Sequence, residues 1–92
     1  MNFETVWTRI CEHEGDGFVT KTGVPFTYSM NGNKLTPSTT IRSIPKSNFE
    51  KAFARMPLEK TTQLRDVQGA SYVFAIMTDE RIFERGDTEH GL

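Results

Sequence analysis

The tripeptide Asn31-Gly32-Asn33 constrains the fold more than any other part of this 92-residue chain. Glycine and asparagine adopt the positive φ angles that a tight hairpin turn requires. Apolar and polar residues alternate before the turn, over residues 26–30, and a return strand begins at Lys34. The sequence therefore predicts an antiparallel hairpin with Lys34 at its tip. Such a hairpin can project from the domain like a wing and contact a binding partner.

Two further strands and one helix are predicted around this hairpin. The strands cover residues 18–20 and 39–44, which are rich in β-branched and aromatic side chains, and Pro45 closes the second one. Apolar residues recur every three or four positions over residues 3–11, which is the spacing of one helix face. Asn2 precedes that helix as its N-cap.

A second helix is predicted after Pro45. Ser47 and Glu50 have the spacing of a capping box, in which each side chain accepts a hydrogen bond from the backbone amide of the other residue. An apolar stripe follows, and Pro57 ends the helix.

The segment beyond the second helix is harder to interpret. Residues 57–69 show little pattern and are expected to form a loop. Residues 70–77 fit both a buried strand and a helix, because a short apolar run does not separate the two. Both alternatives stay open, and a helix capped by Ser71 is the favoured one.

Together these elements predict an α+β fold, with two or three helices on a small antiparallel sheet of three to four strands. A chain of this length forms one two-layer domain, expected over residues 1–83, and the polar residues 84–92 are expected to form a flexible tail. The predicted core consists of large apolar residues from every element: Trp7, Ile10, Phe18, Phe26, Tyr28, Phe49, Phe53, Val73 and Ile76.

Composition excludes several classes of protein. No apolar run approaches the roughly 18 residues of a membrane span, and the charged first twenty residues do not resemble a secretory signal. The single cysteine, Cys11, cannot form an internal disulfide or a thiolate zinc site. We therefore expect a cytoplasmic protein without membrane contact.

Charge is distributed unevenly along the chain, although the net charge is only −1. Residues 17–65 hold eight cations and two anions, whereas the segments before and after carry net charges of −3 and −4. A basic patch attracts a polyanion because binding releases counterions from the phosphates. DNA or RNA is therefore a candidate partner.

The second helix supplies part of the predicted patch. A helical wheel gathers Asn48, Lys51 and Arg55 on the face opposite the apolar stripe. Our first hypothesis is a non-enzymatic nucleic-acid-binding module that uses the basic hairpin and this helix face. Its predicted contact residues are Lys34, Arg42, Lys46, Asn48, Lys51 and Arg55.

Two other interpretations of the charges stay open. The acidic ends of the chain can fold against its basic middle, or the cations can form an ordinary solvated surface. Our second hypothesis is a small homo-oligomeric domain that binds a protein or a small molecule, with subunits joined through exposed sheet edges.

The remaining reactive side chains do not form a specific motif. Cys11, His13, Glu14 and Asp16 lie close in sequence, but Cys11 belongs to the apolar stripe and His13 points about 160° away from it on an ideal helix. We expect a packed cysteine and an exposed histidine rather than a metal site.

Catalytic chemistry is not predicted either. The carboxylates of the last third are not held as a fixed pair (Asp66, Asp79, Glu80, Glu84 and Asp87), His90 lies in the predicted tail, and Ser71 lacks a hydrolase motif. Phe26, Tyr28 and Met30 can form a stacking platform for bases, although a core role fits a small domain better. We expect no catalytic residue, no metal and no cofactor.

Three motifs carry a resemblance over about two-thirds of the chain. They are Phe18-x-Thr20-x-x-Gly23-x-x-Phe26-x-Tyr28, Arg42-x-Ile44-x-Lys46-Ser47-x-Phe49-Glu50, and Gly69-x-Ser71-Tyr72-x-x-Ala75-Ile76-x-x-Asp79-x-Arg81-Ile82. In these residues the chain resembles a small bacterial domain that occurs in orphan proteins of mobile gene cassettes and beside nucleic-acid-processing or defence modules. The resemblance implies nucleic-acid association and a mobile-element origin, and it assigns no catalytic residue.

Overall fold

The hairpin forms as predicted in the computed structural model, which describes residues 2–83. Strands β3 (Tyr28–Asn31) and β4 (Lys34–Pro37) pair antiparallel, and Gly32 at the turn has a φ of +62°. The short strand β5 (Ile44–Pro45) pairs with the other edge of β4, with Leu35 opposite Ile44. The result is a three-stranded antiparallel sheet in the order β3-β4-β5.

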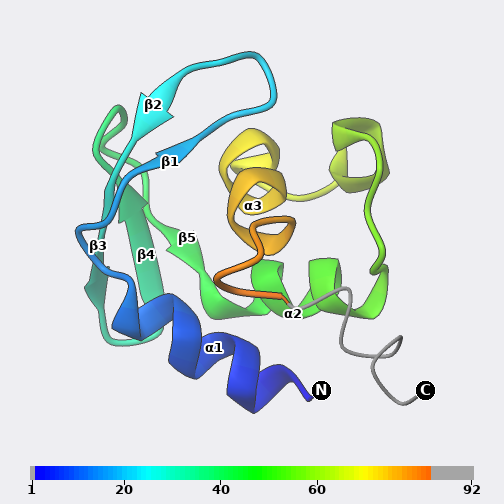
Figure 1. Ribbon diagram of the computed structural model, residues 1–92, viewed down its shortest axis with the longest axis horizontal. Coiled ribbons are helices and arrows are strands. Elements are labelled where there is room, and N and C mark those ends of the chain that lie inside the picture. Colours follow the sequence, from blue (N-terminus) through cyan, green and yellow to red (C-terminus); the bar gives the residue numbers. More distant parts are fainter. Residues whose placement is uncertain (1, 84–92) are drawn as a thin grey trace.

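A second, two-stranded sheet continues from the first. It consists of β1 (Phe18–Val19) and β2 (Pro25–Phe26), paired antiparallel. One residue, Thr27, separates β2 from β3, and Figure 1 shows that the chain runs almost directly from one sheet into the other.

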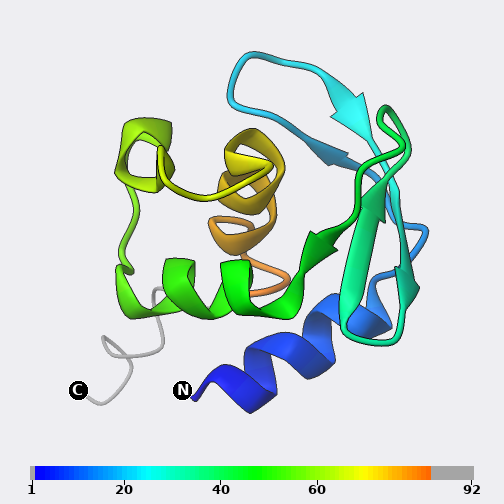
Figure 2. The ribbon, with the colours of Figure 1, turned by 180° about the vertical axis from the view of Figure 1, so that it is seen from behind.

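The sheets are covered by α1 (Phe3–Glu12), α2 (Lys46–Ala54), α3 (Ala70–Met77) and a 3₁₀ helix, η1 (Thr61–Leu64). Figures 1 and 2 both show the sheets on one side of the molecule and α2, α3 and η1 on the other, with α1 running below both. The predicted α+β class is therefore confirmed. The favoured interpretation of residues 70–77 as a helix is correct.

The predicted core is confirmed almost in full. Eight of its nine members are buried, and the ninth, Phe53, is partly buried and packs against them. Phe26 and Tyr28 lie inside, so they do not form an exposed stacking platform. The buried Tyr28 hydroxyl donates to the Ile10 carbonyl over 2.6 Å, which ties β3 to the last turn of α1.

The predicted strand over residues 39–44 is wrong except at its end. Most of this segment is a loop, residues 38–43, which a backbone hydrogen bond ties to Thr27 and two local hydrogen bonds close on itself. The Ser38 amide donates to the Thr27 carbonyl, the Thr40 amide donates to the Pro37 carbonyl, and the Arg42 amide donates to the Thr40 hydroxyl. Only Ile44 joins the sheet as predicted, and Pro45 belongs to the strand it was expected to close.

Of the three predicted helix N-caps, one is correct and two are wrong. Helix α1 has its predicted N-cap, since the Asn2 side chain accepts the Thr5 amide. Helix α2, however, begins at Lys46 without a side-chain cap, so Ser47 lies inside its first turn. Helix α3 follows Gly69, whose left-handed backbone starts the helix before Ser71.

Residues 57–69 are more ordered than the sequence suggested. Leu58, Leu64 and Val67 are buried in the core, and Leu64 is the last residue of η1. The Gln63 side-chain oxygen accepts the amides of Glu59 and Lys60, which fixes the start of η1. This segment therefore forms part of the packed domain.

The expected tail over residues 84–92 and the end of the domain at residue 83 lie outside, or at the limit of, the described residues. Within residues 2–83, no helix has the length and apolar character that crossing a lipid bilayer demands.

Candidate nucleic-acid interface

Three of the six predicted contact residues are exposed cations without an ion pair to any described residue. They are Lys34 at the hairpin tip, Arg42 in the 38–43 loop and Lys51 on α2. The elements that carry them are contiguous, because β4 pairs with β5 and β5 continues directly into α2. We call these three residues the free cations.

Arg55 is engaged within the fold instead. Its guanidinium donates to both Asp66 carboxylate oxygens, over 2.6 Å and 2.9 Å, and to the Gln63 carbonyl over 3.0 Å. These hydrogen bonds lower the pKa of Asp66 to about 2 and raise the pKa of Arg55. Arg55 therefore ties the end of α2 to the η1 region, and its prediction as a free phosphate contact is not supported by this geometry.

Lys46 is half-buried between two helices. Its ammonium lies 3.8 Å from the Glu4 carboxylate of α1 and 5.5 Å from the centre of the Trp7 ring. An acidic residue near the start of the chain thus meets one of the central cations, as the alternative interpretation of the charges anticipated. A second case is Asp66, which meets Arg55.

The placement of Asn48 on an exposed helix face is wrong. Asn48 is only 8% exposed, and its side-chain amide donates to the Gln68 carbonyl over 3.1 Å. The connection between η1 and α3 covers this side of α2, so Asn48 holds that connection in place. The helical wheel placed Asn48 among the solvated residues because it does not include this later segment.

A polar surface that the sequence prediction missed lies on the outer side of the three-stranded sheet. Alternation along the strands turns the buried residues of each strand inward and leaves exposed or half-buried polar residues outside. We call the outer residues the polar sheet face: Ser29, Asn31, Lys34, Thr36 and Ser43. A shallow groove crosses it, lined by Thr27, Tyr28, Ser29, Thr36, Pro37 and Ser38.

The polar sheet face includes no carboxylate of its own. The sequence contains no aspartate or glutamate between Asp16 and Glu50, and this is the signal from which the surface could have been predicted. The Glu14 carboxylate lies at the edge of β3, where it accepts the Met30 amide over 2.8 Å.

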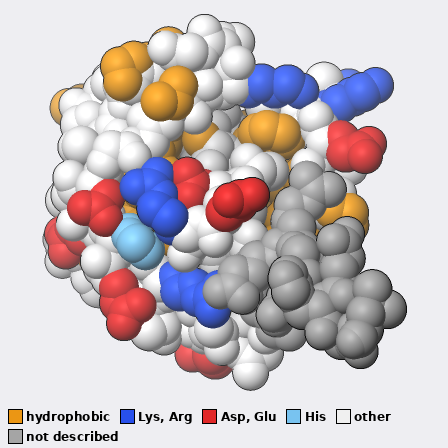
Figure 3. Space-filling model, in the orientation of Figure 1, with side chains coloured by type: hydrophobic (Ala, Val, Ile, Leu, Met, Phe, Trp, Pro, Cys, Tyr) orange, Lys and Arg blue, Asp and Glu red, His pale blue; other side chains and the backbone are white. Residues whose placement is uncertain are grey.

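The face of the molecule seen in Figure 3 has a different character. Basic and acidic side chains lie next to each other there, so no single sign of charge dominates. Arg81 binds both carboxylate oxygens of Asp79, stacks 4.0 Å from the centre of the Phe18 ring and lowers the pKa of Asp79. Such paired charges offer little to a polyanion.

Cys11 and His13 have separate surroundings in the structure. Cys11 is exposed, so the expectation of a packed cysteine is wrong. Partial burial of the thiol, together with the Glu14 carboxylate, raises the pKa of Cys11. His13 contacts Asp16, with 2.8 Å between Nδ1 and the carboxylate, and residues 2–83 contain no cluster of metal-ligating side chains. The other candidates, Glu84, Asp87 and His90, lie outside the described residues.

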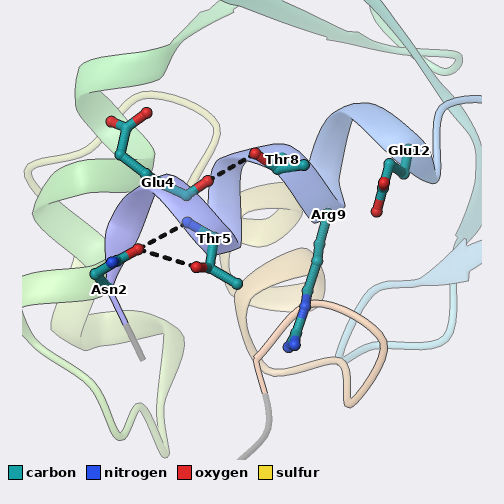
Figure 4. Close-up of a pocket in the computed structure, with 6 residues that line it drawn as sticks. All are labelled: Asn2, Glu4, Thr5, Thr8, Arg9 and Glu12. Carbon is teal, nitrogen blue, oxygen red and sulfur yellow. Dashed lines mark hydrogen bonds between the residues drawn. The ribbon is translucent and has the colours of Figure 1, made fainter.

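A hollow on α1 is drawn in Figure 4, and its side chains do not converge on a common point. Asn2 accepts hydrogen bonds from Thr5, and the Thr8 hydroxyl donates to the Glu4 carbonyl, so these groups are satisfied within the helix. Arg9 extends away from the other residues to donate to the Ile82 carbonyl over 3.4 Å. This arrangement does not favour a ligand.

The free cations and the polar sheet face are therefore the strongest candidate interface in the described part of the chain. Comparisons with protein-family models, with curated proteins and with solved structures give no match, so the resemblance to a mobile-cassette domain stays a prediction.

Proposed function

We propose that this chain is a cytoplasmic, non-enzymatic module that binds nucleic acid through the free cations and the polar sheet face. The observation that supports the proposal most strongly is that Lys34, Arg42 and Lys51 form no ion pair with a described carboxylate, although Lys51 lies near enough to Asp66 to help lower its pKa. Lys34 belongs to a surface of hydroxyl and amide groups and Arg42 adjoins it through Ser43, whereas Lys51 lies on the helix that follows β5. Phosphate oxygens accept hydrogen bonds from such groups as well as from cations. The exposed thiol of Cys11 suits a reducing compartment.

The proposed site differs from the sequence prediction in two ways. Asn48 and Arg55 are excluded as contacts because both are engaged within the fold. Lys46 contributes only weakly, since Glu4 lies beside it. The neutral polar side chains of the sheet take the place of these residues.

Fluorescence anisotropy with labelled single-stranded and duplex oligonucleotides tests the proposal at low salt. Three neutralised phosphates give a slope of about −2 for log K against log salt concentration on single strands, and each lysine removed reduces that slope by about 0.7. Lys34→Gln and Lys51→Gln should each show this reduction. Lys60→Gln is the charge-matched control, because Lys60 lies at the start of η1, away from the sheet.

Two results would contradict the proposal. One is the absence of binding to either oligonucleotide at micromolar protein and low salt. The other is an equal loss of affinity in Lys51→Gln and Lys60→Gln, because that would show attraction by overall charge rather than by this surface.

One observation favours the alternative of a homo-oligomeric domain. Ile41 is 97% exposed in the 38–43 loop, and Val19 and Val24 are exposed in the β1–β2 region. A strand-edge dimer through β3 is less suitable, because the Gly15 amide and the Glu14 carboxylate already bond that edge. Light scattering of the wild type and of Ile41→Ser checks this alternative, and a monomeric wild type counts against it.

A further inference from the structure

A small recess lies beside Arg42, between the 38–43 loop and the start of α3. Its volume is about 150 Å³, and it is lined by Thr40, Arg42, Ile44, Gln68, Gly69 and Tyr72. Drug-sized ligands occupy pockets of roughly 300–1,000 Å³, so this recess suits only a fragment the size of a single ring. It adjoins the polar sheet face through Ser43, which follows Arg42 and contacts Thr36 over 2.9 Å.

Contacts fix the part of the recess that Ile44, Gly69 and Tyr72 form. A Cβ atom on Gly69 would lie only 2.5 Å from Ile44, so the backbone and the buried Ile44 side chain are in close contact. Asn48 holds the Gln68 carbonyl. Tyr72 bonds the Thr39 hydroxyl and packs edge-on against Phe26, with 5.0 Å between ring centres. The apolar and aromatic part of the wall is therefore in place before any ligand binds.

The chemistry of the lining favours a planar, partly apolar group. Ile44 and Tyr72 provide apolar and aromatic surface, Arg42 provides a planar guanidinium, and Gln68 and Thr40 are polar residue types able to bond the edge of a ring. Unpaired nucleobases are held by this combination of stacking surfaces and edge-bonding groups. A phosphate fits less well, because its charge would lie against Ile44 with a single cation to compensate it.

We propose that this recess holds one unpaired nucleobase of a single strand whose backbone crosses the polar sheet face. This inference rests on the proposed nucleic-acid binding and adds a preference for single strands over duplex. A base pair is too large for the recess and keeps its bases stacked within the helix.

The test compares three labelled probes: a short oligothymidylate, an abasic deoxyribose-phosphate chain of the same length, and a duplex. The wild type should bind oligothymidylate at least about fivefold more tightly than the abasic chain, which is the lower end of the effect of stacking one base. Arg42→Gln should remove this preference. Lys51→Gln removes one charge as well but lies outside the recess, so it should weaken both single-stranded probes equally and keep the preference.

The outcomes separate this inference from the proposed function. Equal binding of oligothymidylate and the abasic chain, tighter binding of the duplex, or a preference that survives Arg42→Gln would each overturn the base site while leaving nucleic-acid binding intact. Binding of none of the three probes would overturn both. A second readout is the backbone amide resonance of Gly69, which should shift with oligothymidylate and not with the abasic chain.

Discussion

Replacing Gly69 with alanine should destabilise the fold strongly, for two separable reasons. Gly69 has a φ of +73°, and a left-handed backbone costs an alanine roughly 1–2 kcal/mol. The added Cβ would also lie 2.5 Å from Ile44 Cδ1 and 2.9 Å from Ile44 Cγ1. Ile44 is 2% exposed and cannot swing into solvent, so the overpacking costs a further ~1–3 kcal/mol.

The matched control is Gly32→Ala in the hairpin turn. Gly32 has a φ of +62°, but nothing lies within 4 Å of a Cβ added there. Both variants gain ~0.4–1 kcal/mol because alanine restricts the unfolded chain. We therefore expect losses of about 0–1.6 kcal/mol for Gly32→Ala and about 1–4.6 kcal/mol for Gly69→Ala, with midpoints of about 0.8 and about 2.8 kcal/mol, by combining the contributions that apply to each.

Urea unfolding measures both losses through the fluorescence of Trp7, the single tryptophan of the chain, which is 8% exposed. Adding Ile44→Val removes the Cδ1 atom that the new Cβ would meet, and should recover part of the Gly69→Ala loss. The double variant should therefore lose less free energy of unfolding than the two single variants lose together. Equal losses for Gly69→Ala and Gly32→Ala, or strict additivity of the double variant, would refute the reasoning from close contact.

Three further predictions concern other parts of the fold. Tyr28→Phe should lower the free energy of unfolding by about 1–3 kcal/mol, because the Ile10 carbonyl loses its buried donor; urea unfolding measures this, and an unchanged midpoint contradicts it. The carboxyl of Asp66 has a folded pKa of about 2 against an ordinary 3.8, so the Arg55–Asp66 pair stabilises the fold above pH 3.8 and this contribution is lost as the pH falls towards 2. The stability difference between the wild type and Asp66→Asn should therefore vanish in acid, and a difference independent of pH would exclude this pair as its source. The raised pKa of Cys11 should slow its reaction with disulfide reagents at neutral pH relative to the urea-unfolded chain; equal rates would show that the thiol is unperturbed.

Elements defined by contacts within a few residues could be predicted from the sequence. The first helix and its Asn2 cap depend on a hydrogen bond across three residues, and the hairpin depends on its own turn. The core could also be predicted from the apolar residues of the predicted elements, because a small domain has few other places for large side chains.

Features set by distant contacts could not be predicted in the same way. Helix α2 begins at Lys46, one residue before the predicted cap Ser47. The amide of Lys46 donates to the Asn33 carbonyl at the hairpin turn. Asn48 became buried because residues 66–69 cover its side of α2. In each case the deciding partner lies twelve or more residues away.

The candidate site was predicted in part. Lys34, Arg42 and Lys51 are exposed as expected, whereas the charges of Lys46 and Arg55 are offset by Glu4 and Asp66. Sequence position does not reveal such pairing, because the acids lie in other elements.

The loop of residues 38–43 is anchored at both of its stems. The Thr27 amide and carbonyl both bond Ser38 at one end, and Ile44 pairs with Leu35 at the other. Such an arrangement suits the display of foreign peptides, since the inserted sequence can vary while the stems hold its ends at a constant separation. A library built between Ser38 and Ile44 would thus turn this small domain into a scaffold for selecting new binding specificities.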